Sequence, residues 1–185
     1  RDLHRRHGVE IREGAALVRL TGAAGRVSGA ALADGTTLAA DLVLVPSRAT
    51  ADDLAALGFD SARVRVVPWG VEAHAVTDDD RARVRVLHAL PDRFVLFVGT
   101  LEPRKNLARL AAAVARLDES IPLVVAGASG WGDAVPAGDH VRFLGFVDAA
   151  DLPALYASAT VFAYPSLQEG FGMPILEAMA HGAPV

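Results

Sequence analysis

The sequence predicts an α/β fold in which helices cover a parallel β-sheet, preceded by a short β-rich segment. After residue 46, short apolar runs typical of buried strands alternate with segments typical of helices. Helix-capping residues and glycine-rich loops stand between these runs. The 185 residues are enough for one sizeable core, or for one domain with additional segments.

Residues 1–45 predict short strands separated by turns. Asp34 and Gly35 form a typical hairpin turn between two of these strands. The continuous apolar run 42–45 predicts a strand that is buried on both faces. The expected strands are residues 9–11, 16–20, 30–33, 36–38 and 42–45.

The rest of the chain predicts strands and helices in alternation. Ser47 is a candidate N-cap and Gly58 a candidate terminator of the first helix, and Asn106 is the expected cap of the third. The aspartates at 78–80 suit the positive N-terminal end of the second helix. The expected helices are 48–57, 78–88, 107–117, 152–159 and 174–181. The expected strands are 64–67, 94–98, 123–126, 141–144 and 161–163, with those at 94–98, 123–126 and 141–144 buried.

Ligands of such sheets bind beyond the carboxyl ends of the strands, which directs attention to the loops 99–106, 127–138 and 165–173. The strongest signal is the segment EGFGMPILE, which follows a predicted strand and opens a helix. Its two glycines allow a ligand to approach the backbone, and the free N–H groups of the first helical turn suit a phosphate.

Glu169 and Glu177 flank this phosphate site. Carboxylates repel phosphate, but they suit pairs of hydroxyl groups such as those of a ribose. A phosphate between two polyols describes a nucleotide-sugar. The alternative, that Glu169 is only a helix-start carboxylate and Glu177 only a surface residue, stays open from these residues alone.

A second signal is the segment GTLEPRKN, in which Arg104 and Lys105 stand just before a predicted helix. Their charges add to the attraction of the helix end for anions, and arginine offers a bidentate fork for phosphate oxygens. Two basic residues before a helix are more often solvated surface. Their place on the same sheet edge as the EGFG loop favours the binding interpretation.

Composition excludes several other classes of function. The net charge of −4 argues against a nucleic-acid partner, and the absence of cysteine excludes disulfides and thiolate chemistry. The six histidines show no metal-ligand spacing, so we expect no metal site. No apolar run approaches the roughly 20 residues of a membrane span, and the start lacks a signal peptide, so we expect a cytoplasmic protein. Without an initiator Met, and with an end inside a predicted strand, the chain is expected to be cut at both ends.

These motifs resemble the GT4 family of glycosyltransferases, which share the two-domain GT-B fold. The run EGFGMPILEAMAHGAPV resembles the family's E-x7-E signature with the strand that follows it, and GTLEPRKN resembles its donor-phosphate loop. The pair VPSRATADDLAALGF and VRVVPWGV resembles the crossover between the two GT-B domains. The resemblance covers about residues 40–185 and implies the Rossmann-like sheet of the C-terminal, donor-binding domain, in truncated form.

The resemblance also implies roles for single residues. Glu169 would contact the hydroxyls of the donor sugar, and Glu177 those of the ribose. Arg104 and Lys105 would neutralise the diphosphate leaving group, work that other glycosyltransferases give to a metal. Thr100 stands where many relatives have arginine, which weakens the phosphate assignment. The expected catalytic residues are Glu169, Arg104 and Lys105. The expected donor-binding residues are Gly99, Thr100, Arg104, Lys105, Phe143, Leu144, Gly145, Glu169, Gly170, Phe171, Gly172, Met173 and Glu177.

The implied reaction is transfer of a sugar, with retention, from a GDP- or UDP-linked donor to an acceptor hydroxyl, with Glu169 positioning the sugar. GTLEPRKN is common among relatives that use GDP-mannose, which makes mannose the expected sugar. The acceptor, a saccharide or a lipid-linked group, stays unknown, and membrane association is expected only for a full-length relative. The GT-B domain that binds the acceptor is missing, so we expect donor binding with little turnover. A non-catalytic fragment or nucleotide-binding module is the alternative.

Residues 1–45 instead resemble the nicotinamide domain of FAD- and NAD(P)H-dependent reductases related to ferredoxin reductase. The ADLVLV strand at 40–45 is a natural seam, and our hypothesis is a chimera with segments 1–45, 46–93 and 94–185. The first segment holds no dinucleotide glycine loop and no flavin motif, so we expect neither NAD nor FAD to bind. An oxidoreductase fragment is therefore the weakest alternative.

Overall fold

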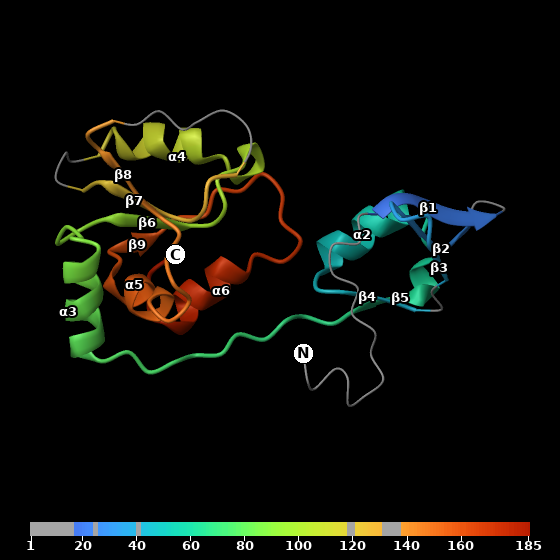
Figure 1. Ribbon diagram of the computed structural model, residues 1–185, viewed down its shortest axis with the longest axis horizontal. Helices are drawn as coiled ribbons and strands as arrows, with labels where there is room; N and C mark the ends of the chain where they lie inside the picture. The colour runs from blue at the N-terminus through green and yellow to red at the C-terminus, as the bar shows by residue number, and fades with distance from the viewer. Residues whose placement is uncertain (1–16, 24–25, 40–41, 118–120, 131–137) are drawn as a thin grey trace. The chain divides into compact units, whose positions relative to one another are not determined.

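A computed structural model describes residues 17–23, 26–39, 42–117, 121–130 and 138–185 of the chain (Figure 1). The chain forms two compact units, Arg1–Pro68 and Trp69–Val185, and each is described by itself. This division falls inside the expected middle segment 46–93. The strand expected at 9–11 lies outside the described residues.

The first unit contains an antiparallel sheet with strand order β1-β2-β3. The turn between β2 and β3 confirms the expected hairpin. Gly35 adopts a φ of 85°, which glycine tolerates, and the Asp34 side chain accepts a hydrogen bond of 2.8 Å from the Thr36 amide. The strands are β1 (Leu17–Ala23), β2 (Arg26–Leu32) and β3 (Thr37–Ala39).

The first unit also contains a two-stranded parallel sheet of β4 (Val43–Val45) and β5 (Val64–Val66). Helix α2 (Arg48–Ala56) and the short helix η1 (Ser61–Arg63) connect the two strands. As expected, Ser47 caps α2: its side chain accepts from the Thr50 amide at 3.1 Å.

The expectation that the 42–45 strand is buried on both faces is wrong. Val45 is buried, but Leu44 is 64% exposed. The physical reason lies in the size of the sheet: within the described residues β4 pairs with β5 alone, and α2 packs against these two strands. A strand in so small a sheet does not have both faces covered.

The second unit contains a parallel sheet of four strands in the order β8-β7-β6-β9. From β6 the chain builds outward through β7 to β8, and then returns to the other side of β6 with β9. In α/β sheets, ligands bind at such a reversal of strand order, beyond the carboxyl ends of the two strands that flank it, here β6 and β9. The strands are β6 (Val95–Val98), β7 (Leu123–Ala126), β8 (Val141–Gly145) and β9 (Val161–Phe162).

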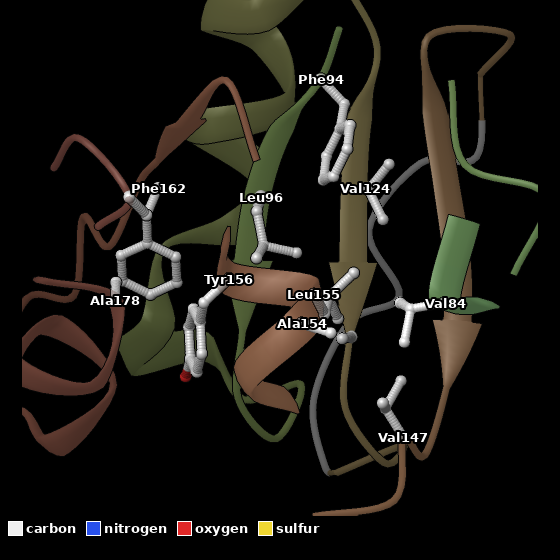
Figure 2. Close-up of a cluster of buried hydrophobic side chains, with 12 residues drawn as sticks. Val84, Phe94, Leu96, Val124, Val147, Ala154, Leu155, Tyr156, Phe162 and Ala178 are labelled. Atoms are coloured by element: carbon white, nitrogen blue, oxygen red, sulfur yellow. The ribbon is translucent and has the colours of Figure 1, made fainter. Parts of the chain in front are cut away.

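Helices cover both faces of this sheet. Helix α4 (Leu107–Val114) lies on one face, while α3 (Asp78–Leu87), α5 (Leu152–Ser158) and α6 (Met173–Ala180) lie on the other (Figure 1). Successive β6 side chains alternate between the two cores: Phe97 packs with α4, and Leu96 packs with Tyr156 of α5. Figure 2 shows the second of these cores, including Leu96 and Tyr156. The apolar run 94–98 is therefore buried on both sides, as expected.

The expectation of a buried strand at 141–144 is wrong. Phe143 in β8 is 40% exposed, and Arg142 is exposed as well. The cause is position, because β8 lies at the end of the strand order and pairs with β7 on one side. An edge strand in this place has fewer neighbours than β6 or β7, and Arg142 in its sequence suits that exposure.

The N-terminus of α3 is fixed by a capping box that the sequence analysis missed. The Thr77 hydroxyl accepts from the Asp80 amide at 3.1 Å, and the Asp80 carboxylate accepts from the Thr77 amide at 3.0 Å. Helix α3 is then tied to α5 through an ion pair of 2.7 Å between Arg83 and the buried Asp151.

The core of the second unit predicts a clear contrast between two leucines. Leu96 is fully buried, so Leu96→Ala should lower the free energy of unfolding by about 2–5 kcal/mol through lost burial and a cavity. Leu87, at the end of α3, is 59% exposed, and Leu87→Ala should change that free energy by less than about 1 kcal/mol. Urea denaturation followed by circular dichroism measures both, and equal losses would contradict this assignment of the core.

Candidate functional site

The loops after β6 and β9 are joined to each other by hydrogen bonds. The Leu167 amide donates to the Arg104 carbonyl at 2.8 Å, and the Asn106 side chain donates to the Pro165 carbonyl at 3.1 Å. The two loops therefore meet at the reversal of strand order, where α/β sheets bind their ligands.

The backbone from 99 to 106 turns sharply to reach this position. Residues Pro103–Lys105 form a short 3-10 helix (η2), and Asn106 follows in the left-handed conformation with a φ of 58°. Asn106 occupies the expected capping position before α4, but its side chain makes no capping hydrogen bond. Its side-chain amide instead donates to the Pro165 carbonyl. The sequence therefore predicted where Asn106 lies, but not the interaction that it makes. Asparagine is one of the few residues that tolerate this backbone conformation.

The junction of the loops brings the three expected catalytic residues together. One oxygen of Glu169, Oε1, lies 2.6 Å from the Lys105 ammonium and 3.0 Å from the Arg104 guanidinium. The Nε atom of Arg104 also donates to Glu102 Oε2 at 2.8 Å. We call Glu102, Arg104, Lys105 and Glu169 the ion-pair cluster. Its two cations and two carboxylates give a formal charge of zero.

Lys105 is the only lysine in the chain, and it is 5% exposed. A buried ammonium is stable only with partners, and Tyr164 supplies two kinds of contact. Its hydroxyl accepts from Lys105 at 2.5 Å, and the ammonium lies 4.7 Å from its ring centroid, within cation–π range. Stacking on Phe97 and Phe162 holds the Tyr164 ring in place. The sequence analysis missed Tyr164, although its place two residues after β9 was an available signal.

The cluster also fixes the charge of Glu169. Partial burial alone favours the neutral acid, but the hydrogen bond from Lys105 and the charges of both cations outweigh it. The pKa of Glu169 is therefore below its ordinary value, and the group is a carboxylate at neutral pH.

The Gly-Phe-Gly segment leads from Glu169 into α6. Gly172 adopts a φ of 88° at the N-cap position, and no side chain caps the helix start at Met173. Phe171 packs edge-on against Trp69, with ring centroids 5.8 Å apart. Gly170 is exposed between Glu169 and Phe171. The exposed backbone beside the cluster is therefore at Gly170, whereas Gly172 at the start of α6 is buried.

Glycines let the carboxyl ends of β6, β7 and β8 approach closely. A Cβ atom at Gly127 would lie 2.0 Å from the Gly99 carbonyl oxygen, so only glycine fits there. The Gly127 amide in turn donates to the Gly145 carbonyl at 2.8 Å. The expected donor-binding residues Phe143, Leu144 and Gly145 therefore lie at the same carboxyl end of the sheet as Gly99 and the exposed Thr100.

Glu177 belongs to a second polar cluster. Its Oε2 accepts a hydrogen bond of 2.8 Å from the hydroxyl of Tyr156 in α5. Burial, together with the Glu177 charge, raises the pKa of Tyr156, so this hydroxyl stays a neutral donor. Glu177, Tyr156, His74 and His181 line a cavity of about 260 Å³. The two carboxylates of the EGFGMPILE segment thus have different partners, one cationic and one phenolic, and Tyr156 was not expected.

The lowered pKa of Glu169 predicts a pH-dependent contribution to stability. A carboxylate whose pKa is lower in the folded state stabilises the fold above its ordinary pKa of about 4.5, and this contribution is lost as pH falls through the folded-state value. Wild type should therefore be more stable than Glu169→Gln at pH 7, and the difference should shrink below about pH 4.5. Urea denaturation between pH 7 and pH 3 measures it, and two parallel curves would contradict the charge assignment.

The fold of this chain is similar to those of two solved structures. Anabaena Alr3699/HepE, solved with UDP and glucose, superposes with a TM-score of 0.70 at 25% identity, covering 80% of this chain and 44% of that one. The sucrose-phosphate synthase of Thermosynechococcus elongatus gives a TM-score of 0.64 at 30% identity, covering 78% of this chain and 40% of that one. The expected Rossmann-like sheet of a GT-B C-terminal domain is confirmed.

Two curated proteins extend this similarity to sequence. The O-antigen chain mannosyltransferase B of Escherichia coli is 45% identical over 104 residues, which are 50% of this chain and 27% of that protein. The D-inositol 3-phosphate glycosyltransferase of Mycobacterium sp. (strain KMS) is 35% identical over 160 residues, or 79% of this chain and 36% of that protein. The chain therefore spans about a quarter to a third of the length of these relatives.

Neither these proteins nor the two structures is a reductase, so the resemblance of residues 1–45 to reductases stays a prediction. Among the described residues, no helix is long and apolar enough to cross a membrane. Residues 78–185, which hold the sheet of the second unit, the ion-pair cluster and Glu177, match the model of the glycosyl transferases group 1. The chain belongs to this family of glycosyltransferases.

Proposed function

We propose that the second unit is the donor-binding part of a retaining, GT4-type glycosyltransferase that uses a GDP- or UDP-linked sugar. The observation that carries this proposal is the pairing of Lys105 and Arg104 with Glu169 at the reversal of strand order. The complex of Alr3699/HepE with UDP-glucose supports a nucleotide-sugar as donor. The identity to a mannosyltransferase supports mannose as the sugar.

In this proposal Lys105 and Arg104 bind the diphosphate. Negative charge grows on the leaving diphosphate as its bond to the anomeric carbon breaks, and fixed cations stabilise that charge. Lys105 suits this role because Tyr164 accepts a hydrogen bond from its ammonium and keeps the charge at this junction of the loops. Arg104 is 45% exposed in its side chain and can add a bidentate contact. These cations do the work that a divalent metal does elsewhere, so we expect no metal requirement.

The hydroxyl groups of the donor would bind the two carboxylates. Glu169 lies beside Lys105 and Arg104, the proposed diphosphate ligands, and the sugar is attached to the diphosphate at this end. The backbone from Gly170 to Met173 continues along the same part of the donor site. Glu177 would accept hydrogen bonds from the ribose, and the cavity that it lines supports this assignment. The exposed ring of Phe143 offers a face to the base, with the main chain of Leu144 and Gly145 beside it.

Transfer itself would need more than this unit. The acceptor hydroxyl bonds to the face of the anomeric carbon that the diphosphate leaves, which gives retention, and the acceptor must be held there. The acceptor stays unassigned, as a saccharide or a lipid-linked group. We therefore propose donor binding, with little transfer, for this chain alone, in the cytoplasm where nucleotide-sugars would be its ligands.

The first test is a calorimetric and thermal-shift titration with GDP, UDP, ADP, NAD and FAD. A ligand that binds the native state raises its apparent stability. GDP or UDP should stabilise the chain, and NAD and FAD should not do so even at millimolar concentration. Lys105→Met should weaken the binding of GDP or UDP by about tenfold or more, because a charged hydrogen bond to phosphate is lost.

The matched control is Arg116→Met, which removes the same charge at the other end of α4. It should change nucleotide affinity less than about twofold, since exposed charges at that distance are screened by salt. No binding of any nucleotide by a folded wild-type chain would refute the proposed function. Saturable binding of NAD or FAD would instead favour the oxidoreductase alternative.

Glu177 predicts a separate effect that depends on the ribose. Glu177→Gln should weaken the binding of GDP or UDP by about threefold to tenfold, because a charged acceptor for two hydroxyls becomes neutral. The same substitution should leave the affinity for inorganic pyrophosphate unchanged, since pyrophosphate has no ribose. Competition calorimetry with both ligands measures the difference, and equal losses for both would show that Glu177 acts through the fold.

A further inference from the structure

The cations of the ion-pair cluster already have an anionic partner. A single oxygen of Glu169 accepts a hydrogen bond from Lys105 at 2.6 Å and forms an ion pair with Arg104 at 3.0 Å. The carboxylate of Glu102 forms a second ion pair with Arg104, with 2.8 Å between its Oε2 atom and the Arg104 Nε atom. A diphosphate that binds these cations must therefore compete with a carboxylate of the chain itself.

This competition has a consequence for Glu169. Its side chain is 22% exposed, so a diphosphate that draws Lys105 and Arg104 away leaves a half-buried carboxylate without its partners. An uncompensated charge in such a place is unfavourable. Hydroxyl groups that donate to Glu169 can offset this loss, and a nucleotide-sugar carries such groups next to its diphosphate. A nucleoside diphosphate carries none at that end.

We propose that Glu169 is a specificity-determining residue that favours the intact nucleotide-sugar over the nucleoside diphosphate left after transfer. The inference rests on the proposed function and deepens it. Glu169 weakens the binding of both ligands by holding the cations, but only the sugar returns hydrogen bonds to it. After transfer the nucleotide no longer carries the sugar. Glu169 then forms its ion pairs with Lys105 and Arg104 again, and this displaces the nucleoside diphosphate.

Glu102 provides an internal comparison for this role. It holds the Nε atom of the same guanidinium, and its side chain is 19% exposed, close to the value for Glu169. Its carboxylate bonds to Arg104, whereas the Lys105 ammonium donates to Glu169 instead. Glu102 also precedes η2 rather than the glycine loop of the sugar site. Removing its charge should strengthen the binding of nucleotide and nucleotide-sugar alike.

The test measures the affinities of the full chain for GDP and GDP-mannose, and for UDP and UDP-glucose. In wild type the nucleotide-sugar should bind more tightly than the nucleoside diphosphate. In Glu169→Gln the nucleoside diphosphate should bind about fivefold to tenfold more tightly, and the preference for the nucleotide-sugar should fall by at least as much. In Glu102→Gln both affinities should rise together, so that the preference is unchanged.

A double-mutant cycle separates this proposal from simple repulsion between Glu169 and phosphate. In a Lys105→Met background, the gain from Glu169→Gln should shrink to about twofold or less, because the shared cation is gone. A gain that persists in full would overturn the proposal, since Glu169 would then repel the ligand directly. An unchanged or weaker affinity for the nucleoside diphosphate in Glu169→Gln would overturn it as well.

The single lysine offers a readout that needs no variant. Protein made with ¹⁵N-lysine should give one side-chain signal, from Lys105 Nζ. Saturation with the nucleoside diphosphate should move this signal as the ammonium leaves Glu169, and binding without any movement would overturn the proposal. If a folded wild-type chain binds neither pair of ligands, the proposed function fails. If it binds them and the preference does not depend on Glu169, this inference alone fails.

Discussion

The buried ammonium of Lys105 is the interaction on which the arrangement of the site depends. At 5% exposure this cation needs hydrogen-bond acceptors, and the structure supplies them from the loop after β9, through Tyr164 and Glu169. The loop after β6 must therefore stay against the loop after β9, as the bond between Leu167 and Arg104 also requires. The geometry of the cluster depends on strand order. Because β9 pairs with β6 on the side opposite β7, the loops that follow β6 and β9 lie side by side.

Neutrality is the second constraint on the cluster. Two unpaired cations in a partly buried place would be unfavourable, and the chain avoids this with Glu102 and Glu169. The same pairing sets the conditions for any anionic ligand, which has to offer more than the carboxylate that it displaces. The stability of the fold and the affinity for an anionic ligand are thus coupled through one oxygen atom of Glu169. A change that strengthens its ion pairs stabilises the fold and weakens the binding of that ligand.

The sequence predicted the fold class and most helices and strands of the second unit, but not the short helix η2 or all the contacts of the candidate site. Apolar runs identified β6 and β7 within a residue, because central strands of a parallel sheet are buried on both faces. The same pattern gave a wrong prediction for β8, in which Phe143 is exposed because the strand lies at the end of the sheet. A short apolar segment does not reveal its strand's position in the sheet. Motif spacing placed Arg104, Lys105 and Glu169 together. It could not find Tyr164 or Tyr156, whose roles depend on which side chains the fold brings opposite them.

The two carboxylates of the glycine loop explain how one short segment can suit both ends of a nucleotide-sugar. Glu169 faces two cations, so a diphosphate can replace it there and sugar hydroxyls can satisfy it afterwards. Glu177 is bonded to the neutral hydroxyl of Tyr156, whose raised pKa keeps its proton. Within the described part of the chain, the carboxylate of Glu177 has this phenolic partner and no cationic one, which suits hydroxyl donors and opposes phosphate. The partners of the two carboxylates, and not the carboxylates themselves, therefore determine which part of the donor each can bind.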